Sequence, residues 1–192
     1  SGGGKSTILA EVLKAADNID YSVSFTTRPP RGTEQNGVAY HFVDEREFLR
    51  RREEGDFLET AQVFGCWYGT SKSFIQGRLA ARRHVIMDID VQGAAQICST
   101  DIPQVKIFII PPSMEILRER LMKRATDSPQ EIEKRLTIAR KELEYIPDYD
   151  YLVVNNELSQ AVREVLAIVQ AEENRVGRYR DPIKGFLKQE NQ

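Results

Sequence analysis

Short apolar runs alternate with stretches of helical spacing along much of this chain. The runs with the length of buried strands are 84–90, 105–110 and 151–154. Apolar residues recur at helical spacing in 6–16, 113–123 and 159–174. Ser113 and Ser159 occupy the positions expected of N-caps. Because strands that alternate with helices are typical of a largely parallel sheet flanked by helices, the pattern predicts an α/β fold.

Two segments break this alternation. The segment from about Arg28 to Ala81 is rich in Thr, Arg, Tyr and Gly, and it predicts a small, partly β inserted region. Residues 123–149 are highly charged, and helical spacing places Arg120 and Arg124 on one face. A polar helical hairpin with few core residues is what a moving lid requires. The predicted division is 1–27 core, 28–82 inserted region, 83–119 core, 120–149 lid, and 150–192 core with a C-terminal helix and tail.

The chain opens on Ser1-Gly2-Gly3-Gly4-Lys5-Ser6-Thr7, the C-terminal part of the pattern G-x-x-x-x-G-K-[ST]. Glycines allow a turn whose backbone N–H groups form a concave anion site, and the following helix adds the positive end of its dipole. The segment therefore predicts a phosphate-binding loop. The alternative is a flexible glycine-rich start, which the apolar spacing of the next helix disfavours. Because the pattern normally follows a buried strand, we expect a hydrophobic strand and the start of the loop to precede Ser1.

Composition and charge narrow the class of protein. The 192 residues fit one domain, and a hydrophobic fraction of 41% is normal for a globular chain. The net charge of -2 supplies no basic field for nucleic acid, and no apolar run reaches the length of a membrane span, so we expect neither partner. Cys66 and Cys98 form no motif with the histidines, which disfavours a disulfide or zinc framework and predicts a cytoplasmic protein. Both a monomer and a homo-oligomer stay open.

Further motifs follow one another along the chain. They are Ser24-Phe25-Thr26-Thr27-Arg28-x-Pro30-Arg31, Glu34-x-x-Gly37-x-x-Tyr40, Phe57-Leu58-Glu59, Tyr68-Gly69-Thr70, Asp88-Ile89-Asp90-x-Gln92-Gly93, Arg120-x-x-x-Arg124 and Val154-Asn155. Each motif is weak alone, but together with the loop they make the chain resemble the guanylate kinases over essentially its whole length. The resemblance implies a P-loop NTPase-type parallel sheet flanked by helices, a small mixed α/β region that binds GMP, and a helical lid that closes over ATP. It also implies transfer of the ATP γ-phosphoryl group to GMP, and to dGMP, with Mg²⁺.

The resemblance implies a set of residues that recognise guanine. Guanine presents N1–H and N2–H donors, and a single carboxylate can accept both. Glu59 is the implied acceptor, with Ser24 and Thr70 as hydroxyl partners and Asp90 facing the same region. Adenine would leave the Glu59 carboxylate unpaired, and pairing of this kind can discriminate by roughly 10⁴ or more. Without the other motifs, Glu59 would be interpreted as a solvated charge.

A second set would hold the phosphate of GMP. The forked donors of Arg28 and Arg31 suit a phosphate, and the hydroxyls of Tyr40 and Tyr68 can add hydrogen bonds. Packing in a sheet is compatible with both tyrosines. Since the attacking phosphate oxygen is already ionised, no general base is expected.

The donor side is assigned in the same way. Residues Ser1 to Thr7 would hold the ATP phosphates, and Asn155 is an implied adenine-side contact. Ser6 and Asp88 would hold Mg²⁺. Transfer would then depend on positioning and charge neutralisation by Lys5 and by the lid residues Arg120, Arg124 and Arg135.

Two other functions are weighed against this one. A guanylate-kinase-like protein-interaction module would bind partners without catalysis, but it would need neither Lys5 nor Asp88. A related kinase could act on another small molecule such as a phosphorylated sugar, but Glu59 with Ser24 favours a guanine nucleotide.

Overall fold

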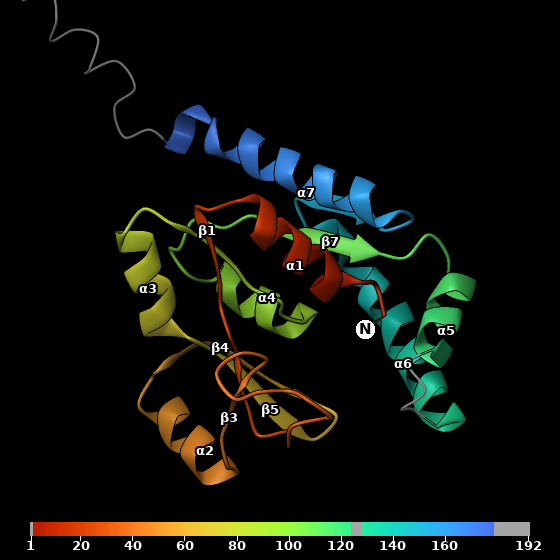
Figure 1. The fold of residues 1–192 in the computed structure, drawn as a ribbon. Helices are drawn as coiled ribbons and strands as arrows, with labels where there is room; N and C mark the ends of the chain where they lie inside the picture. Colours follow the sequence, from red (N-terminus) through yellow and green to blue (C-terminus); the bar gives the residue numbers. More distant parts are fainter. Residues whose placement is uncertain (1, 124–127, 179–192) are drawn as a thin grey trace, which may run out of the picture.

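Two pairs of parallel strands lie at the centre of the fold (Figure 1). The computed structural model describes residues 2–123 and 128–178. In the first pair, β1 (Ile19–Tyr21) lies beside β6 (His84–Ile86). In the second pair, β7 (Ile107–Ile110) lies beside β8 (Tyr151–Val154). The α/β class with parallel strands is therefore confirmed.

The two pairs are not joined into one sheet. Within residues 2–123 and 128–178, no ladder connects β6 to β7. A cavity of about 270 Å³ lies beside β7 and is lined by residues 107–110 together with 89–91. The strand expected upstream of Ser1 stays a prediction.

Two long helices cover the strand pairs with an apolar face. Helix α1 (Lys5–Ala15) packs against α7 (Leu158–Glu173), which Figure 1 shows in blue along one side of the molecule. Their buried residues recur at helical spacing, and this stripe explains why both segments form helices here. The core cluster contains Ile8, Val12, Ile19, Val153, Ala161 and Val165.

Two expectations about element ends were wrong. The run 84–90 is a strand only as far as Ile86, because its partner β1 ends opposite that residue at Tyr21. Residues 87–90 then lead into α4 (Val91–Cys98). The run 105–110 likewise pairs only from Ile107. Apolar character alone does not show where a partner strand ends.

The predicted N-caps also differ in outcome. Ser113 precedes α5 (Met114–Lys123), and its Oγ accepts the Ile116 N–H at 3.2 Å, as a cap does. Helix α7 instead has Glu157 at its N-cap position, and no side chain caps it. Ser159 lies inside the helix and donates to the Glu157 carboxylate.

The inserted region folds around its own four-stranded sheet. The strands are β2 (Phe25–Thr26), β3 (His41–Phe42), β4 (Phe57–Val63) and β5 (Cys66–Ser71), in the order β3-β2-β5-β4. Only β2 and β3 pair in parallel, so the sheet is mixed. The helices of this region are α2 (Glu45–Glu53) and α3 (Lys72–Ala80).

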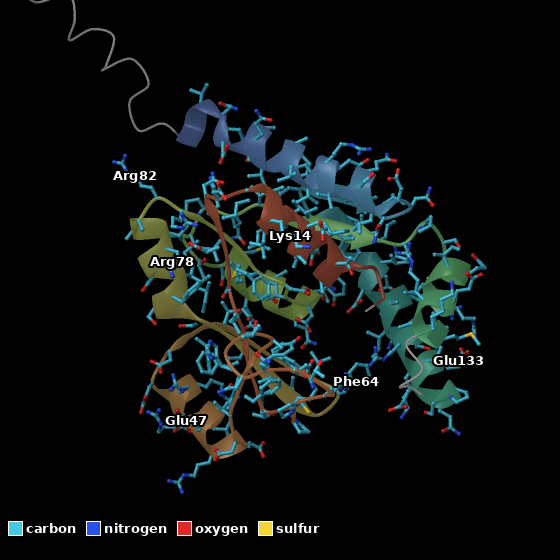
Figure 2. All side chains as sticks on the ribbon, in the orientation of Figure 1. Lys14, Glu47, Phe64, Arg78, Arg82 and Glu133 are labelled. Carbon is cyan, nitrogen blue, oxygen red and sulfur yellow. The ribbon has the colours of Figure 1, made fainter. Side chains whose placement is uncertain are left out.

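Aromatic rings fill the space between this sheet and α2. Phe48 is fully buried and stacks on Phe57 and Trp67, with ring centroids 4.6 Å and 5.9 Å apart. Strand β2 begins at Phe25 and belongs to this sheet although it precedes residue 28. Figure 2 shows Phe64 at the tip of the β4–β5 hairpin, on the side of the lid.

The segment predicted as a lid, 120–149, forms together with the start of α5 a pair of helices with a small core of its own. Helix α5 packs against α6 (Pro129–Glu142), which runs on into a 3₁₀ segment, Leu143–Asp148. Ser128 and Glu131 form a capping box at the start of α6. The buried residues are Leu117, Leu121, Ile132, Leu136 and Ala139. The hairpin therefore has more core residues than its charged sequence predicted.

Two findings concern the described residues as a whole. None of their helices is long and apolar enough to cross a membrane. Cys66 and Cys98 are free thiols, so no disulfide joins them.

Candidate active site

The predicted phosphate loop turns sharply into α1. Gly2 and Gly4 have φ values of 80° and 86°, in the left-handed region that favours glycine. A Cβ on Gly4 would lie 2.1 Å from Asn155 Nδ2, so the close approach also requires glycine. No side chain caps α1, and the first N–H groups of a helix have no partner within it. These donors and the helix dipole together form an anion site.

Asn155 and Arg120 hold the loop in place. Asn155 Nδ2 donates to the Gly3 carbonyl at 2.9 Å, and Arg120 Nη2 donates to the Asn155 carbonyl at 2.9 Å. Arg120 Nη1 is buried and has no hydrogen-bond partner among the described residues. It lies 4.0 Å from the position of a Cβ on Gly4. A buried guanidinium donor beside the loop fits a bound anion such as a terminal phosphate.

Asp88 lies next to the loop from the other side. Its carboxylate is 3.7 Å from Lys5 Nζ and accepts from Ser6 Oγ at 3.4 Å. A hydroxyl and a carboxylate are hard oxygen donors, and Mg²⁺ at a nucleotide needs only one or two protein ligands besides phosphate and water. The pair therefore fits Mg²⁺. Among the described residues, no group of three or more His, Cys, Asp or Glu side chains is arranged to hold a metal ion, and a nucleotide-bound Mg²⁺ does not require one.

Glu59 is a buried carboxylate in the inserted region. Its side chain lies on β4 and the residue is 5% exposed. Thr70, opposite on β5, donates its hydroxyl to Glu59 Oε1 at 2.7 Å. Burial raises the pKa of Glu59, and the charge of Asp90 adds to the rise. Ser24 and Thr70 are also buried, so the polar groups expected to read guanine are gathered where water has little access.

Asp90 reaches this site in a different way from that predicted. It was expected to point from the end of a strand, but residues 87–90 are not a strand. Asp90 is instead the N-cap of α4, and its Oδ1 accepts the Gly93 N–H at 2.9 Å. Its effect on the Glu59 pKa still places the two carboxylates in one electrostatic environment.

Arg28 is the most buried of the residues predicted to hold the phosphate of GMP. It is 8% exposed, and its two terminal nitrogens donate to the two Glu34 carboxylate oxygens at 2.9 Å each. Its guanidinium also lies 5.2 Å from the centre of the Tyr40 ring, and Tyr68 packs edge-on against Tyr40. Arg31 has an exposed side chain, but its backbone N–H donates to Glu34 Oε2 at 2.7 Å. Glu34 thus joins both arginines.

Asp88 contacts the loop and also acts electrostatically on tyrosines near the Arg28 cluster. Besides contacting the loop, its charge contributes to the raised pKa of Tyr40, which is mainly due to burial. Burial and Asp88 likewise raise the pKa of Tyr21 to about 12. The loop and the Arg28 cluster therefore lie within electrostatic reach of one carboxylate.

Comparison with known proteins shows to which family the chain belongs. The family model described as guanylate kinase matches residues 1–172. The chain belongs to the guanylate kinase family. The guanylate kinase of Thermotoga maritima is 45% identical over 186 residues, covering 97% of this chain and 90% of the relative. That of Nitrosomonas europaea is 46% identical over 172 residues, covering 90% and 86%. The crystal structure of guanylate kinase from Anaplasma phagocytophilum has a TM-score of 0.77 and 34% identity, covering 89% of this chain and 83% of that one.

Of the residues predicted for the site, Lys5 and Ser6 contact Asp88, and Tyr40 lies within its electrostatic reach. Thr7 is exposed on α1, and Arg135 lies half-buried on α6 of the lid. Ser1 and Arg124 fall outside the described residues. Asn155 contacts the loop through its amide, and its predicted contact with adenine stays a prediction.

Sequence reasoning missed three residues that lie in or beside the candidate site. Glu34 was noticed only as part of a motif, although it holds Arg28. Tyr21 gave no signal beyond its place in a short strand. Gly93 was likewise quoted only as a motif letter, although a Cβ there would lie 2.6 Å from Glu59 Oε2. A lone glycine in a helical stretch is the signal that could have identified it, because glycine is unfavourable there without a packing reason.

Proposed function

We propose that this protein transfers the γ-phosphoryl group of ATP, with Mg²⁺, to GMP and to dGMP, giving ADP and the nucleoside diphosphate. The observation that carries the proposal is the position of Asp88. It contacts Lys5 and Ser6 of the phosphate loop, and it acts electrostatically on Tyr40 beside Arg28. The phosphate loop and the Arg28 cluster are thus both within electrostatic reach of this carboxylate, which suits a nucleoside triphosphate on one side and a second phosphate on the other.

On the donor side, the amides at the start of α1 bind the ATP phosphates. Lys5 and Arg120 Nη1 face the terminal phosphates and neutralise charge that moves to the leaving oxygen. Arg124 and Arg135 of the lid add to this as the lid closes. Ser6 and Asp88 would hold Mg²⁺, which would neutralise phosphate charge when bound.

On the acceptor side, Glu59 selects guanine. In the ionised form its carboxylate accepts from guanine N1–H and N2–H, while Thr70 keeps one oxygen in place. Two added donors favour the ionised form and offset the effect of burial on its pKa. Ser24 and Asp90 complete the polar wall around the base. Adenine presents an acceptor, N1, where guanine presents a donor. The buried Glu59 carboxylate would then have no hydrogen-bond donor to pair with, which costs binding free energy.

The GMP phosphate is gripped by Arg28, Arg31, Tyr40 and Tyr68. This phosphate is an ionised monoester, so its oxygen attacks without a general base. Catalysis then consists of in-line positioning and charge neutralisation. A cytoplasmic location belongs to the same proposal.

The test is an assay of ADP release with MgATP and GMP, dGMP, AMP or UMP in parallel. We expect turnover with GMP and dGMP and little or none with AMP or UMP. Equal turnover with AMP would overturn the role of Glu59. GMP binding without turnover would instead favour a non-catalytic binding module.

A further inference from the structure

Gly93 occupies an unusual place in α4. It is the third residue of the helix, its φ is not in the left-handed region, and no turn requires a glycine there. In such a position alanine would normally stabilise the helix. A reason for the glycine must therefore come from its surroundings.

Those surroundings contain the Glu59 carboxylate. A Cβ built on Gly93 would lie 2.6 Å from Glu59 Oε2 and 3.1 Å from its Cδ. The nearest other atom, the Cβ of Ile89, is at an ordinary 3.5 Å. The missing side chain thus leaves space for one group in particular. The other oxygen of that group is already held by Thr70.

The helix cannot easily retreat to make room. Three residues after Gly93, on the same face of α4, the Gln96 side chain pairs with the backbone of Thr60, next to Glu59. Gln96 Oε1 accepts the Thr60 N–H at 3.1 Å, and Gln96 Nε2 donates to the Thr60 carbonyl at 2.7 Å. This double hydrogen bond fixes the spacing between α4 and β4. An added methyl group would therefore displace the end of the Glu59 side chain, which is the part that can move.

We propose that Gly93 is a specificity-determining positioning residue, which keeps the Glu59 carboxylate at the place where it meets the guanine edge. The inference rests on the proposed function of Glu59. Gly93 would not contact the nucleotide itself and would act only through the space that its missing side chain leaves for the Glu59 carboxylate.

The experiment compares Gly93→Ala with Gly77→Ala. Gly77 lies in α3, is exposed, and a Cβ there would meet nothing within 4 Å. Gly93→Ala should raise the KM for GMP about ten- to a hundredfold, because a charge-assisted pair is misplaced. The KM for ATP should stay unchanged, since the phosphate loop is a separate site. Gly77→Ala should change neither KM and should raise the Tm by up to about 3 °C.

A double-mutant cycle with Glu59→Ala identifies the path of the effect. In the Glu59→Ala background, Gly93→Ala should not change the KM for GMP any further. It should raise the Tm of the ligand-free protein, as Gly77→Ala does. An effect of equal size with and without Glu59, or a rise in both KM values, would overturn the proposal. So would an unchanged KM for GMP in Gly93→Ala, or a double variant that fails to fold.

The same cycle separates this inference from the proposed function. If Glu59→Ala leaves the preference for GMP over AMP unchanged, Glu59 does not read guanine and both assignments fall. If Glu59→Ala loses that preference while Gly93→Ala keeps it, the function stands and only the role of Gly93 is refuted.

Discussion

Replacing Glu34 by alanine should destabilise the protein because it removes the partner of a buried charge. Arg28 is 8% exposed, and both of its terminal nitrogens donate to Glu34. After the substitution, the guanidinium would keep the Pro29 carbonyl and the neighbouring aromatic rings. Leaving a buried charge without its partner costs several kcal/mol, but the Glu34 side chain is 27% exposed, so water can replace part of it. We expect a loss of about 2–3 kcal/mol in the free energy of unfolding.

Urea unfolding measures this loss as a shift of the midpoint at constant slope. The control is Glu133→Ala on the lid (Figure 2), which removes a pair with Arg118 in which the two side chains are 56% and 47% exposed. That pair should contribute less than about 1 kcal/mol. If the two variants lose the same small amount of unfolding free energy, Glu34 does not stabilise a buried charge.

Two further measurements test the same cause. Inorganic phosphate should stabilise Glu34→Ala more than the wild type, because an anion can take the place of the carboxylate. The hydrogen bonds from Arg28 keep the pKa of Glu34 below its ordinary value of 4.5. The contribution of Glu34 to the free energy of unfolding is therefore fully present above pH 4.5, and it decreases as the pH falls below that value. The difference between wild type and Glu34→Gln should shrink in the same range.

Three other predictions concern the two halves of the site. Lys5→Met should abolish turnover and leave GMP binding, measured by calorimetry, largely intact; equal loss of both would contradict two separate sites. Asn155→Ala should weaken the binding of ATP more than that of GMP, because the amide donates a hydrogen bond to the Gly3 carbonyl of the loop. If the substitution weakened only GMP binding, Asn155 would not support the loop. Glu59→Gln should lose GMP selectivity, yet the ligand-free variant should gain stability relative to wild type as the pH rises above 4.5, because the folded-state pKa of Glu59 is raised. Parallel stability curves for wild type and variant would show that the carboxylate is not destabilised by burial.

Some parts of the fold could be predicted because they depend on neighbours in sequence. The phosphate loop needs glycines next to a helix start, and Gly2 and Gly4 take the required left-handed conformation. Helices α1 and α5 begin within a residue of the predicted starts, since caps and apolar spacing are local. Strand 151–154 was predicted at its observed bounds.

Other parts could not be predicted because the deciding contact comes from elsewhere in the chain. The strand at 84–90 is short because β1 is short, and Ser159 is not a cap because α7 starts at Leu158. Helices α5 and α6 form a core because the apolar residues of each helix face those of the other. In the sequence these residues are separated by many charged ones, so the core was not predicted.

The sequence by itself therefore predicted which groups the site has available: a glycine-rich loop before a helix, a carboxylate proposed to recognise guanine, and arginines proposed to hold a phosphate. Only the tertiary structure decided where those groups lie, what they contact and how deeply they are buried. Asn155 meets Gly3 across 152 positions, and Gln96 fixes β4 across 36. Glu59 looks like a solvated charge in the sequence, and it becomes a buried one because α4 approaches β4 closely at a residue without a side chain. Burial and close approach are properties of packing between distant segments, and no local pattern of residues encodes them.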